Sequence, residues 1–288
     1  MDNAFTSCKS LADVKRRLRD SLIPKYGDRE SAEMARIILM HLKNWDLTRL
    51  LANEDNEAGD FIKARSQEIL GKLLADMPIQ YALGETVFYG LKLKVGPGVL
   101  VPRPETQQLV DIIVDENNRA DLRVLDLCTG SGAIAIALSR YLPFSTVDAL
   151  DVSAKALEYA RENSDSLKAG IHIIQDDIFQ HAFHYKGYDI VVSNPPYVDE
   201  SEKKDMEANV LDYEPYEALF VPDEDPLVFY RRIAEVGLDV LKPAGKLYLE
   251  INPNHADELK RLLEKSGYRD ICILKDIHGK DRFAKAIL

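Results

Sequence analysis

The sequence lacks long apolar runs, has few cysteines and carries no excess of positive charge. No apolar segment approaches the roughly 20 residues needed to span a bilayer, and the first residues lack the basic and apolar regions of a signal peptide. Three cysteines, Cys8, Cys128 and Cys272, are scattered without a Cys-x-x-Cys pair, which argues against a disulfide framework or a metal site. We therefore expect a cytoplasmic protein with no bound metal and no membrane association.

The charge balance restricts the possible partners. The formal net charge is -11, whereas binding to bare nucleic acid depends on Lys and Arg contacts with phosphates. We therefore expect no direct nucleic-acid contact, and an acidic surface suits a basic protein partner instead. At 288 residues, the chain is long enough for two domains, or for one domain with an appendage.

The first part of the chain is predicted to be helical. Apolar residues recur at helical spacing in three segments: Leu11, Val14, Leu18 and Leu22; Ala35, Ile38 and Leu42; Ile62, Ile69, Leu70 and Leu73. From residue 79 to residue 101 the period changes to two, which predicts a hairpin with strands at 86–89 and 91–95. The interpretation is an N-terminal helical domain over residues 1–77 and a β-hairpin linker over residues 78–105.

The remaining residues, 106–288, alternate between strand and helix patterns, which places the protein in the α/β fold class. Seven strands are predicted, at residues 123–127, 146–150, 171–174, 190–193, 246–251, about 270–274 and 282–287. Such an order predicts a mostly parallel, doubly wound sheet, in which the last two strands form an antiparallel hairpin at the edge.

Acidic residues stand at or near the ends of three successive predicted strands. Asp126 precedes a small-residue turn that differs from the G-x-G-x-x-G fingerprint, because a cysteine replaces the first glycine. Asp151 ends the next strand, where a carboxylate can accept both ribose hydroxyls. Asp177 follows the third strand and can accept from an adenine amine while Ile178 packs on the ring. The turn itself consists of Cys128, Thr129, Gly130, Ser131 and Gly132. We interpret these residues as a site for a nucleoside that bears an amino acid.

The fourth predicted strand ends in Asn194-Pro195-Pro196-Tyr197. The prolines must stop the strand, and they present the Asn194 side chain and the Pro195 carbonyl together at its end. Two acceptors suit a planar NH2 group, and the Tyr197 ring can lie on its flat face. Taken alone, the same residues are also compatible with a simple turn after a core strand.

In motif order, the region from Leu122 to Leu288 resembles class I S-adenosylmethionine methyltransferases, which have a Rossmann-like seven-stranded sheet. Nearly the whole chain resembles HemK/PrmC-type release-factor glutamine methyltransferases. This closer resemblance rests on Pro78-Ile79-Gln80-Tyr81, Gly84, Phe88, Gly90, the segment from Pro97 to Thr106, Tyr213-Glu214-Pro215 with Ala218-Leu219, and Asp276, Gly279, Asp281 and Arg282. Arg103-Pro104-Glu105-Thr106 is the most specific of these marks.

The resemblance implies a function and assigns roles to the residues above. Residues 106–288 are expected to bind S-adenosylmethionine, with S-adenosylhomocysteine as product, through the strand-end acids, the turn and Asn194. The expected reaction is methylation of the side-chain nitrogen (N5) of glutamine in the Gly-Gly-Gln motif of class I peptide chain release factors, by a monomer. The residues expected to act on the substrate are Asn194, Pro195 and Tyr197 as catalytic residues, with Pro196, Arg103, Glu105 and Phe88 in substrate binding.

Three alternatives stay open at this point. One is an adenine-N6 amino-methyltransferase of DNA or RNA, against which the acidic charge and the Arg103 to Thr106 segment argue. A second is glutamine methylation of a ribosomal protein, and a third is a non-enzymatic binding scaffold. Three departures from the family pattern are expected to affect surrounding loops and not the pocket. They lie at Gln107, at residues 221–226 and at residues 252–254, where the family usually has a glycine. We expect His181 and His184 to be surface residues, and we identify no general base.

Overall fold

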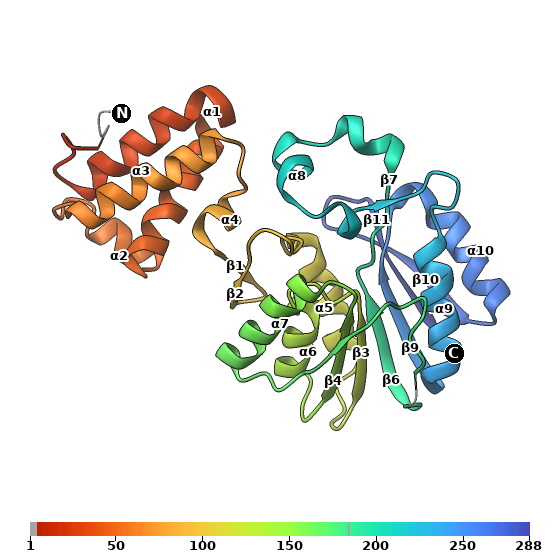
Figure 1. Ribbon diagram of the computed structural model, residues 1–288. Helices are drawn as coiled ribbons and strands as arrows, with labels where there is room; N and C mark the ends of the chain where they lie inside the picture. Colours follow the sequence, from red (N-terminus) through yellow and green to blue (C-terminus); the bar gives the residue numbers. More distant parts are fainter. Residues whose placement is uncertain (1–4, 184) are drawn as a thin grey trace. The chain divides into compact units, whose positions relative to one another are not determined.

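The computed structural model describes residues 5–183 and 185–288, so His184 lies outside the described residues. The chain forms two compact units (Figure 1). A helical unit runs from the start of the described residues to Gly84 and includes Ala208–Tyr213, and an α/β unit contains Glu85–Glu207 and Glu214–Leu288.

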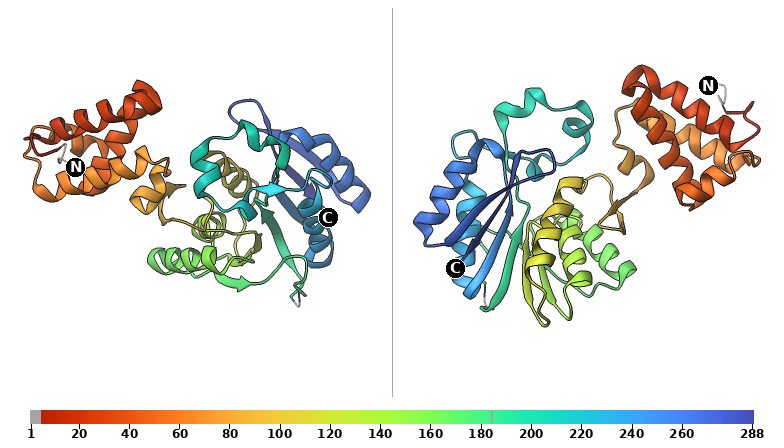
Figure 2. Two further views of the ribbon diagram at one scale, coloured as in Figure 1. Left: turned by 45° about the horizontal axis from the view of Figure 1, so that its top comes forward. Right: turned by 180° about the vertical axis from the view of Figure 1, so that it is seen from behind.

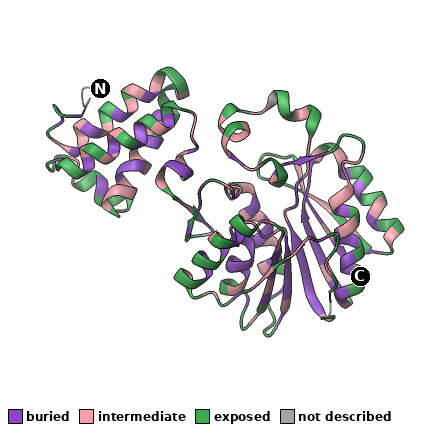
Figure 3. Ribbon diagram, in the orientation of Figure 1, coloured by how far each residue is buried: buried purple, intermediate pink, exposed green. Residues whose placement is uncertain are grey.

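The helical unit is built from α1 (Leu11–Lys43), α2 (Leu47–Ala52), α3 (Asp60–Leu74) and α4 (Ile79–Leu83), with α8 (Ala208–Tyr213) from later in the chain. Ser10 and Asp13 form a capping box at the start of α1, and this helix is interrupted at Gly27, between the first two predicted apolar stripes. All three stripes supply its core (Figure 3), although Leu42 is only partly buried. No helix in the described part of the chain is both long and apolar enough to cross a membrane.

The short helix α4 corrects one prediction. The period of two was expected to begin at Ile79, but Ile79–Leu83 forms a single helical turn in which Tyr81 and Ala82 are buried. Gly84 ends the turn with φ of +78°, a left-handed conformation that favours glycine. The hairpin begins directly after it, with β1 (Glu85–Phe88) and β2 (Leu91–Lys94) paired antiparallel.

The α/β unit contains a seven-stranded sheet in the order β10-β11-β9-β6-β3-β4-β5, and the prediction of the α/β class I methyltransferase fold is confirmed. Its strands β3, β4, β5, β6 and β9 are parallel, whereas β10 and β11 form the predicted antiparallel edge. The strand bounds are β3 Arg123–Leu127, β4 Thr146–Asp151, β5 His172–Gln175, β6 Tyr188–Ser193, β9 Leu241–Glu250, β10 Arg269–Lys275 and β11 Asp281–Ile287. A further parallel pair, β7 (Val198–Asp199) with β8 (Phe220–Val221), was not predicted.

Helices cover both faces of this sheet (Figure 2). One face packs on α5 (Pro104–Glu116), α6 (Ala133–Tyr141) and α7 (Ala154–Leu167), and the other on α9 (Val228–Val240) and α10 (Ala256–Ser266). Alternate residues of each strand enter the two cores: Val124, Ile190 and Val192 belong to the first, and Leu125, Val191 and Leu247 to the second. Because both faces are buried, the central strands are apolar almost throughout.

The chain reverses its direction of travel across the sheet at β3 and β6. From β3 the chain adds β4 and β5 on one side, and it then returns to place β6 on the other side of β3. Leu127 pairs with Ser193 in the parallel register, and the Ser193 hydroxyl donates to the Leu127 carbonyl over 2.7 Å. The segments after β3 and β6 therefore leave the sheet side by side, where α/β folds bind their ligands.

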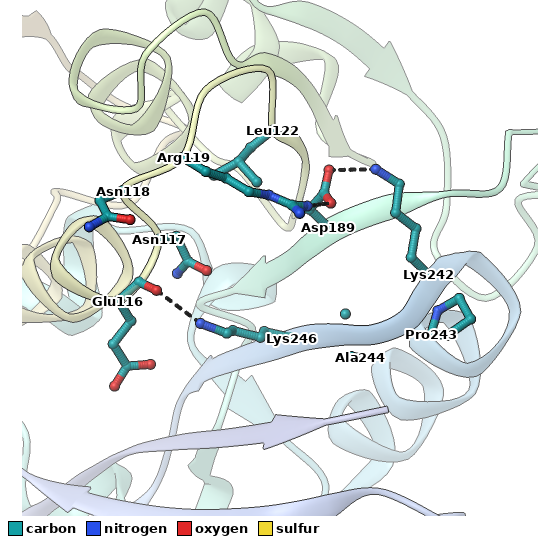
Figure 4. A pocket seen from close by; sticks show the side chains of 11 residues that line it. Glu116, Asn117, Asn118, Arg119, Leu122, Asp189, Lys242, Pro243, Ala244 and Lys246 are labelled. Atoms are coloured by element: carbon teal, nitrogen blue, oxygen red, sulfur yellow. Dashed lines mark hydrogen bonds and ion pairs between the residues drawn. The ribbon is translucent and has the colours of Figure 1, made fainter.

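At the amino ends of the parallel strands, the Asp189 side chain connects the starts of β3, β6 and β9 (Figure 4). Its carboxylate accepts from the Arg123 amide at 2.9 Å and from Lys242 Nζ at 2.8 Å, and it also pairs with Arg119. Asp189, Lys242 and Arg119 border a cavity of about 350 Å³. In Figure 4, dashed lines join Lys242 to Asp189 and Lys246 to the Glu116 backbone carbonyl. Because these charged groups already have partners, this cavity is not the candidate active site.

We predict that Asp189→Asn lowers the free energy of unfolding at pH 7 by about 1–3 kcal/mol, because the Arg123 amide, Lys242 and Arg119 lose a buried, charged acceptor. Burial alone would raise the pKa of Asp189, but hydrogen bonds from Lys242 and the Arg123 amide hold it below the ordinary value of 3.8. The carboxylate therefore stabilises the fold fully above that pH, and the stabilisation is lost as the pH falls through the lower pKa of the folded state.

Urea unfolding followed by circular dichroism, at pH 7 and below pH 4, measures the difference, which should shrink in acid. Asp239→Asn is the matched control, because this exposed carboxylate pairs only with Lys186 among the described residues and should change stability by less than about 0.5 kcal/mol. Equal stability of the Asp189 variant and the wild type at pH 7 would contradict the prediction.

Candidate active site

A cavity of about 560 Å³ opens at the carboxyl ends of β3, β4, β5 and β6. A cavity of this size and place is typical of a ligand site in an α/β sheet. Seven residues singled out from the sequence line this cavity, and they come from four separate strand ends: Cys128, Gly130, Asp151, Asp177, Ile178, Asn194 and Pro196. Its remaining walls are largely apolar and include Val99, Leu100, Phe179 and Phe229.

The turn after β3 presents backbone to this cavity. Cys128, Gly130 and Gly132 all have left-handed conformations, with φ of +60°, +57° and +80°. A Cβ atom at Gly132 would lie 3.1 Å from Ile136 Cδ1 and 3.3 Å from Ala160 Cβ, so glycine is favoured there by space as well as by conformation. Cys128 adopts the same region despite its side chain, and burial raises the pKa of its thiol, which stays neutral.

Asp126, which is predicted to bind the cofactor, is not among the residues that line the cavity, and its cofactor contact stays a prediction. The Asp126 side chain is fully buried, and its Oδ2 atom accepts from Thr129 Oγ1 at 2.6 Å and from the Ala135 amide at 3.2 Å. Burial raises the pKa of this carboxyl to about 7. Asp126 therefore stabilises the turn from behind. Thr129, Ser131 and Gly132 are also absent from the cavity lining, and their part in cofactor binding stays a prediction.

Asp151 and Asp177 lie at the cavity wall. The two oxygens of Asp151 accept from the amides of Gly130, at 2.8 Å, and Ser153, at 2.9 Å, so the carboxylate is fixed in place. Asp177 accepts from the Phe179 amide at 3.0 Å and from Gln180 Nε2 at 3.0 Å. Since each carboxylate oxygen accepts more than one hydrogen bond, both residues can still accept from a ligand.

The Asn194 side chain is held through its NH2 group. Its Nδ2 atom donates to Thr106 Oγ1, at 3.4 Å, from the first turn of α5. No hydrogen bond from the described residues reaches its Oδ1 atom or the Pro195 carbonyl, so both acceptors remain for a ligand. The sequence prediction of two adjacent acceptors therefore agrees with the hydrogen bonds around this strand end.

Tyr197 is anchored by a residue that the sequence reasoning missed. The Tyr197 hydroxyl donates to Glu250 Oε1 at 3.1 Å, and the Thr106 hydroxyl donates to Glu250 Oε2 at 2.7 Å. Glu250 is buried and ends β9. An acidic residue at a strand end was the signal used for Asp126 and Asp151, and the same signal would have found Glu250.

Other predicted substrate residues lie away from the cavity lining. Phe88 is 1% exposed and belongs to the hydrophobic core that also contains residues of α5 and α6, so the predicted substrate contact is wrong. Arg103 pairs with Glu214 at 2.7 Å rather than with Glu105. The roles of Arg103 and Glu105 in substrate binding stay predictions.

One family departure reaches the site, contrary to expectation. Asn252 Nδ2 donates to the Tyr197 carbonyl at 3.0 Å and to Glu202 Oε2 at 2.8 Å, so residues 252–254 do contact the motif backbone. Among the described residues, no group of three or more His, Cys, Asp and Glu side chains could hold a metal ion.

Comparison with known proteins defines the class of the fold and site. Residues 104–213 match the methyltransferase small domain and residues 11–84 the PrmC N-terminal domain. A solved methyltransferase structure from Pyrococcus furiosus superposes with a TM-score of 0.52 at 19% identity, covering 78% of this chain and 97% of that chain. The α/β unit is thus a class I methyltransferase domain whose cofactor is S-adenosylmethionine.

Closer relatives define the family. The release factor glutamine methyltransferase of Bacteroides thetaiotaomicron is 46% identical over 270 residues, which cover 93% of this chain and 97% of the relative. That of Flavobacterium psychrophilum is 40% identical over 264 residues, covering 90% and 93%. The chain belongs to the release factor glutamine methyltransferase family, as the sequence resemblance predicted.

We predict that Asp151→Ala weakens the binding of S-adenosylmethionine at least about tenfold, because a charge-assisted acceptor for the ribose hydroxyls is lost. Isothermal titration with S-adenosylhomocysteine measures the loss without turnover. Asp148→Ala is the control on the same strand, since its carboxylate accepts from Tyr188 and His172 and does not line the cavity. Unchanged affinity in the Asp151 variant would remove this residue from the cofactor site.

Proposed function

We propose that this protein transfers a methyl group from S-adenosylmethionine to the side-chain nitrogen (N5) of the glutamine in the Gly-Gly-Gln motif of peptide chain release factors. The observation that supports this most directly is the hydrogen bonding of Asn194. Its Nδ2 atom is committed to Thr106, which leaves Oδ1, next to the Pro195 carbonyl, to accept from a substrate NH2 group. The related release factor glutamine methyltransferases point to the same substrate.

The cavity lining fits the cofactor by its chemistry. Asp151 offers a fixed carboxylate for the ribose hydroxyls, and Asp177 offers an acceptor for the adenine amine beside the apolar Ile178 and Phe179. The Gly130 turn lets the backbone approach closely, because no Cβ atom stands in the way. When bound, S-adenosylmethionine supplies an electrophilic methyl group on a sulfonium.

The protein's own task is to orient the acceptor nitrogen. The lone pair of an amide nitrogen is delocalised into the carbonyl, so a glutamine side chain is a poor nucleophile and its alignment matters. Asn194 Oδ1 and the Pro195 carbonyl each accept one N–H, which directs the lone pair at the methyl group. They also stabilise the partial positive charge that develops on the nitrogen in the transition state. The nitrogen–carbon bond forms as the sulfur–carbon bond breaks, and the surplus proton leaves the nitrogen for solvent.

Adenine in DNA or RNA has less support as the acceptor. The two acceptors at Asn194 and Pro195 would suit an adenine amine equally well. The chain, however, carries a net charge of -11, whereas nucleic-acid binding is driven by Lys and Arg contacts with phosphates.

We predict that Asn194→Ala lowers the turnover number by at least about 100-fold and changes the affinity for S-adenosylmethionine much less, since the lost interaction belongs to the transition state. Labelled methyl donor and a class I release factor measure turnover, and mass spectrometry locates the label. A release factor with the Gly-Gly-Gln glutamine changed to alanine is the substrate control. Undiminished turnover in the Asn194 variant would contradict the role assigned to Asn194. Label found on a nucleic acid would mean that the substrate is a nucleic acid and not the release factor.

We further propose that residues 1–77 form the domain that recognises the release factor. Two large apolar side chains of this region, Leu51 at 55% and Phe61 at 65% exposure, are available for a protein partner. Its own core is complete without them. We also propose that the protein acts as a cytoplasmic monomer, in keeping with its three free cysteines.

We predict that Phe61→Glu raises KM for the release factor about tenfold and leaves kcat unchanged, because an apolar contact with the partner is lost from a unit that contributes no residue to the cavity. Initial rates at varied release factor concentration separate the two parameters. Phe144→Glu is the matched control, as Phe144 is 84% exposed between α6 and β4. The proposal fails if KM stays at the wild-type value, or if both variants raise it equally.

A further inference from the structure

Glu250 is a buried carboxylate that the proposed chemistry does not use directly. It is 1% exposed at the end of β9, yet both of its oxygens are occupied. Oε2 accepts from the Thr106 hydroxyl at 2.7 Å, and Oε1 accepts from the Tyr197 hydroxyl at 3.1 Å. Burying a carboxylate is costly, so its retention beside the Asn194 motif requires a reason.

Nearby groups compensate the buried charge. Burial raises the pKa of Glu250, while the hydrogen bonds donated by Thr106 and Tyr197 and the positive charge of Arg282 act against that rise. Arg282, from β11, is in turn paired with Asp276 at 3.4 Å. The carboxylate is therefore held by groups from three separate parts of the chain.

With Glu250 ionised, the hydrogen atoms in this network can point in one direction only. Thr106 has a single hydroxyl hydrogen, and it is given to Glu250. The oxygen lone pairs of Thr106 are then free to accept, and they accept from Asn194 Nδ2 at 3.4 Å. With the amide of Asn194 reversed, its Oδ1 atom would face the lone pairs of Thr106, and no hydrogen atom would lie between the two oxygens.

We infer that Glu250 is a positioning residue: through Thr106 it turns the Asn194 amide so that Oδ1 faces the acceptor nitrogen, and through the Tyr197 hydroxyl it holds the tyrosine ring. This inference rests on the proposed function and adds a residue to its machinery. Glu250 itself need not touch the substrate. Its contribution is the direction in which two neighbouring side chains present their polar groups.

The first test is Glu250→Gln, which keeps the size of the side chain but replaces one acceptor oxygen by an NH2 group. With that group towards Thr106, the threonine hydroxyl must donate to Asn194, and the Asn194 amide reverses. With it towards Tyr197, the phenol loses its acceptor. We expect single-turnover methylation of the release factor to slow about 10- to 100-fold, and the Kd for S-adenosylhomocysteine to stay within about twofold of wild type.

A second pair of variants separates positioning from simple packing. Thr106→Val removes the hydroxyl at nearly constant volume and should slow methyl transfer to a similar degree. Thr106→Ser keeps the hydroxyl and should restore most of the rate. Because both residues act through one chain of hydrogen bonds, the double variant Thr106→Val with Glu250→Gln should be little slower than the slower single variant.

Tyr248→Phe serves as the control for removing a buried hydroxyl. It lies on the same strand, and its hydroxyl donates to Glu116 Oε2 at 2.9 Å, outside this network. We expect it to change the melting temperature without slowing methyl transfer.

Three results would overturn the inference while the wild type remains active. The first is a wild-type methylation rate in both Glu250→Gln and Thr106→Val. The second is an equal loss of rate in Thr106→Val and Thr106→Ser. The third is a rate loss in the double variant that equals the product of the two single losses. An inactive wild type on the release factor would instead refute the proposed function, so the two failures are distinguishable.

Discussion

The active site depends on the parallel pairing of β3 with β6. This pair lies where the chain reverses its direction across the sheet, so no helix crosses over the carboxyl ends of these two strands. The register sets Leu127 beside Ser193, and the next residues along each strand are Cys128 and Asn194. Both line the same cavity. A shift of one residue in this register would turn the alternate residues of β6 to the wrong core, so the packing of both faces fixes the position of the Asn194 motif.

A second constraint is that a buried polar group must find partners, and it explains the arrangement behind the motif. Hydrogen bonds join four side chains into one network. Asn194 and Tyr197 follow β6, Thr106 belongs to α5, and Glu250 ends β9. Every donor in this network has an acceptor only if Thr106 and Tyr197 donate to Glu250 and Asn194 donates to Thr106. The same fold also contains a buried carboxyl with a free oxygen, Asp126 Oδ1, which has no partner among the described residues. The contrast indicates that one acid serves a turn while the other serves the site.

Sequence patterns predicted the seven-stranded sheet because strands buried on both faces leave short, almost wholly apolar runs between helical segments, and the predicted β3 matches the observed Arg123–Leu127. They also located the polar residues at the strand ends. They did not show which acid faces the cavity, because Asp126 and Asp151 both stand at strand ends and differ only in how the following turn folds over them. Phe88 was misassigned for a similar reason, since a hairpin residue faces either solvent or core and only the tertiary packing decides. Glu250 carries the same strand-end signal, but its role depends on partners 144 and 53 residues away along the chain, and the sequence does not show that they meet.

Asn252 shows how a departure from the family pattern can alter the site without altering its chemistry. Where the pattern has glycine, this chain has a side chain that donates to the Tyr197 carbonyl and to Glu202. The Tyr197 amide already donates to the Leu219 carbonyl at 3.2 Å. The backbone of Tyr197 is therefore held from both sides, in addition to the bond from its hydroxyl to Glu250. Glycine could make no such side-chain bond, so in this protein the β7 segment and the start of the loop after β9 are tied directly to the catalytic motif.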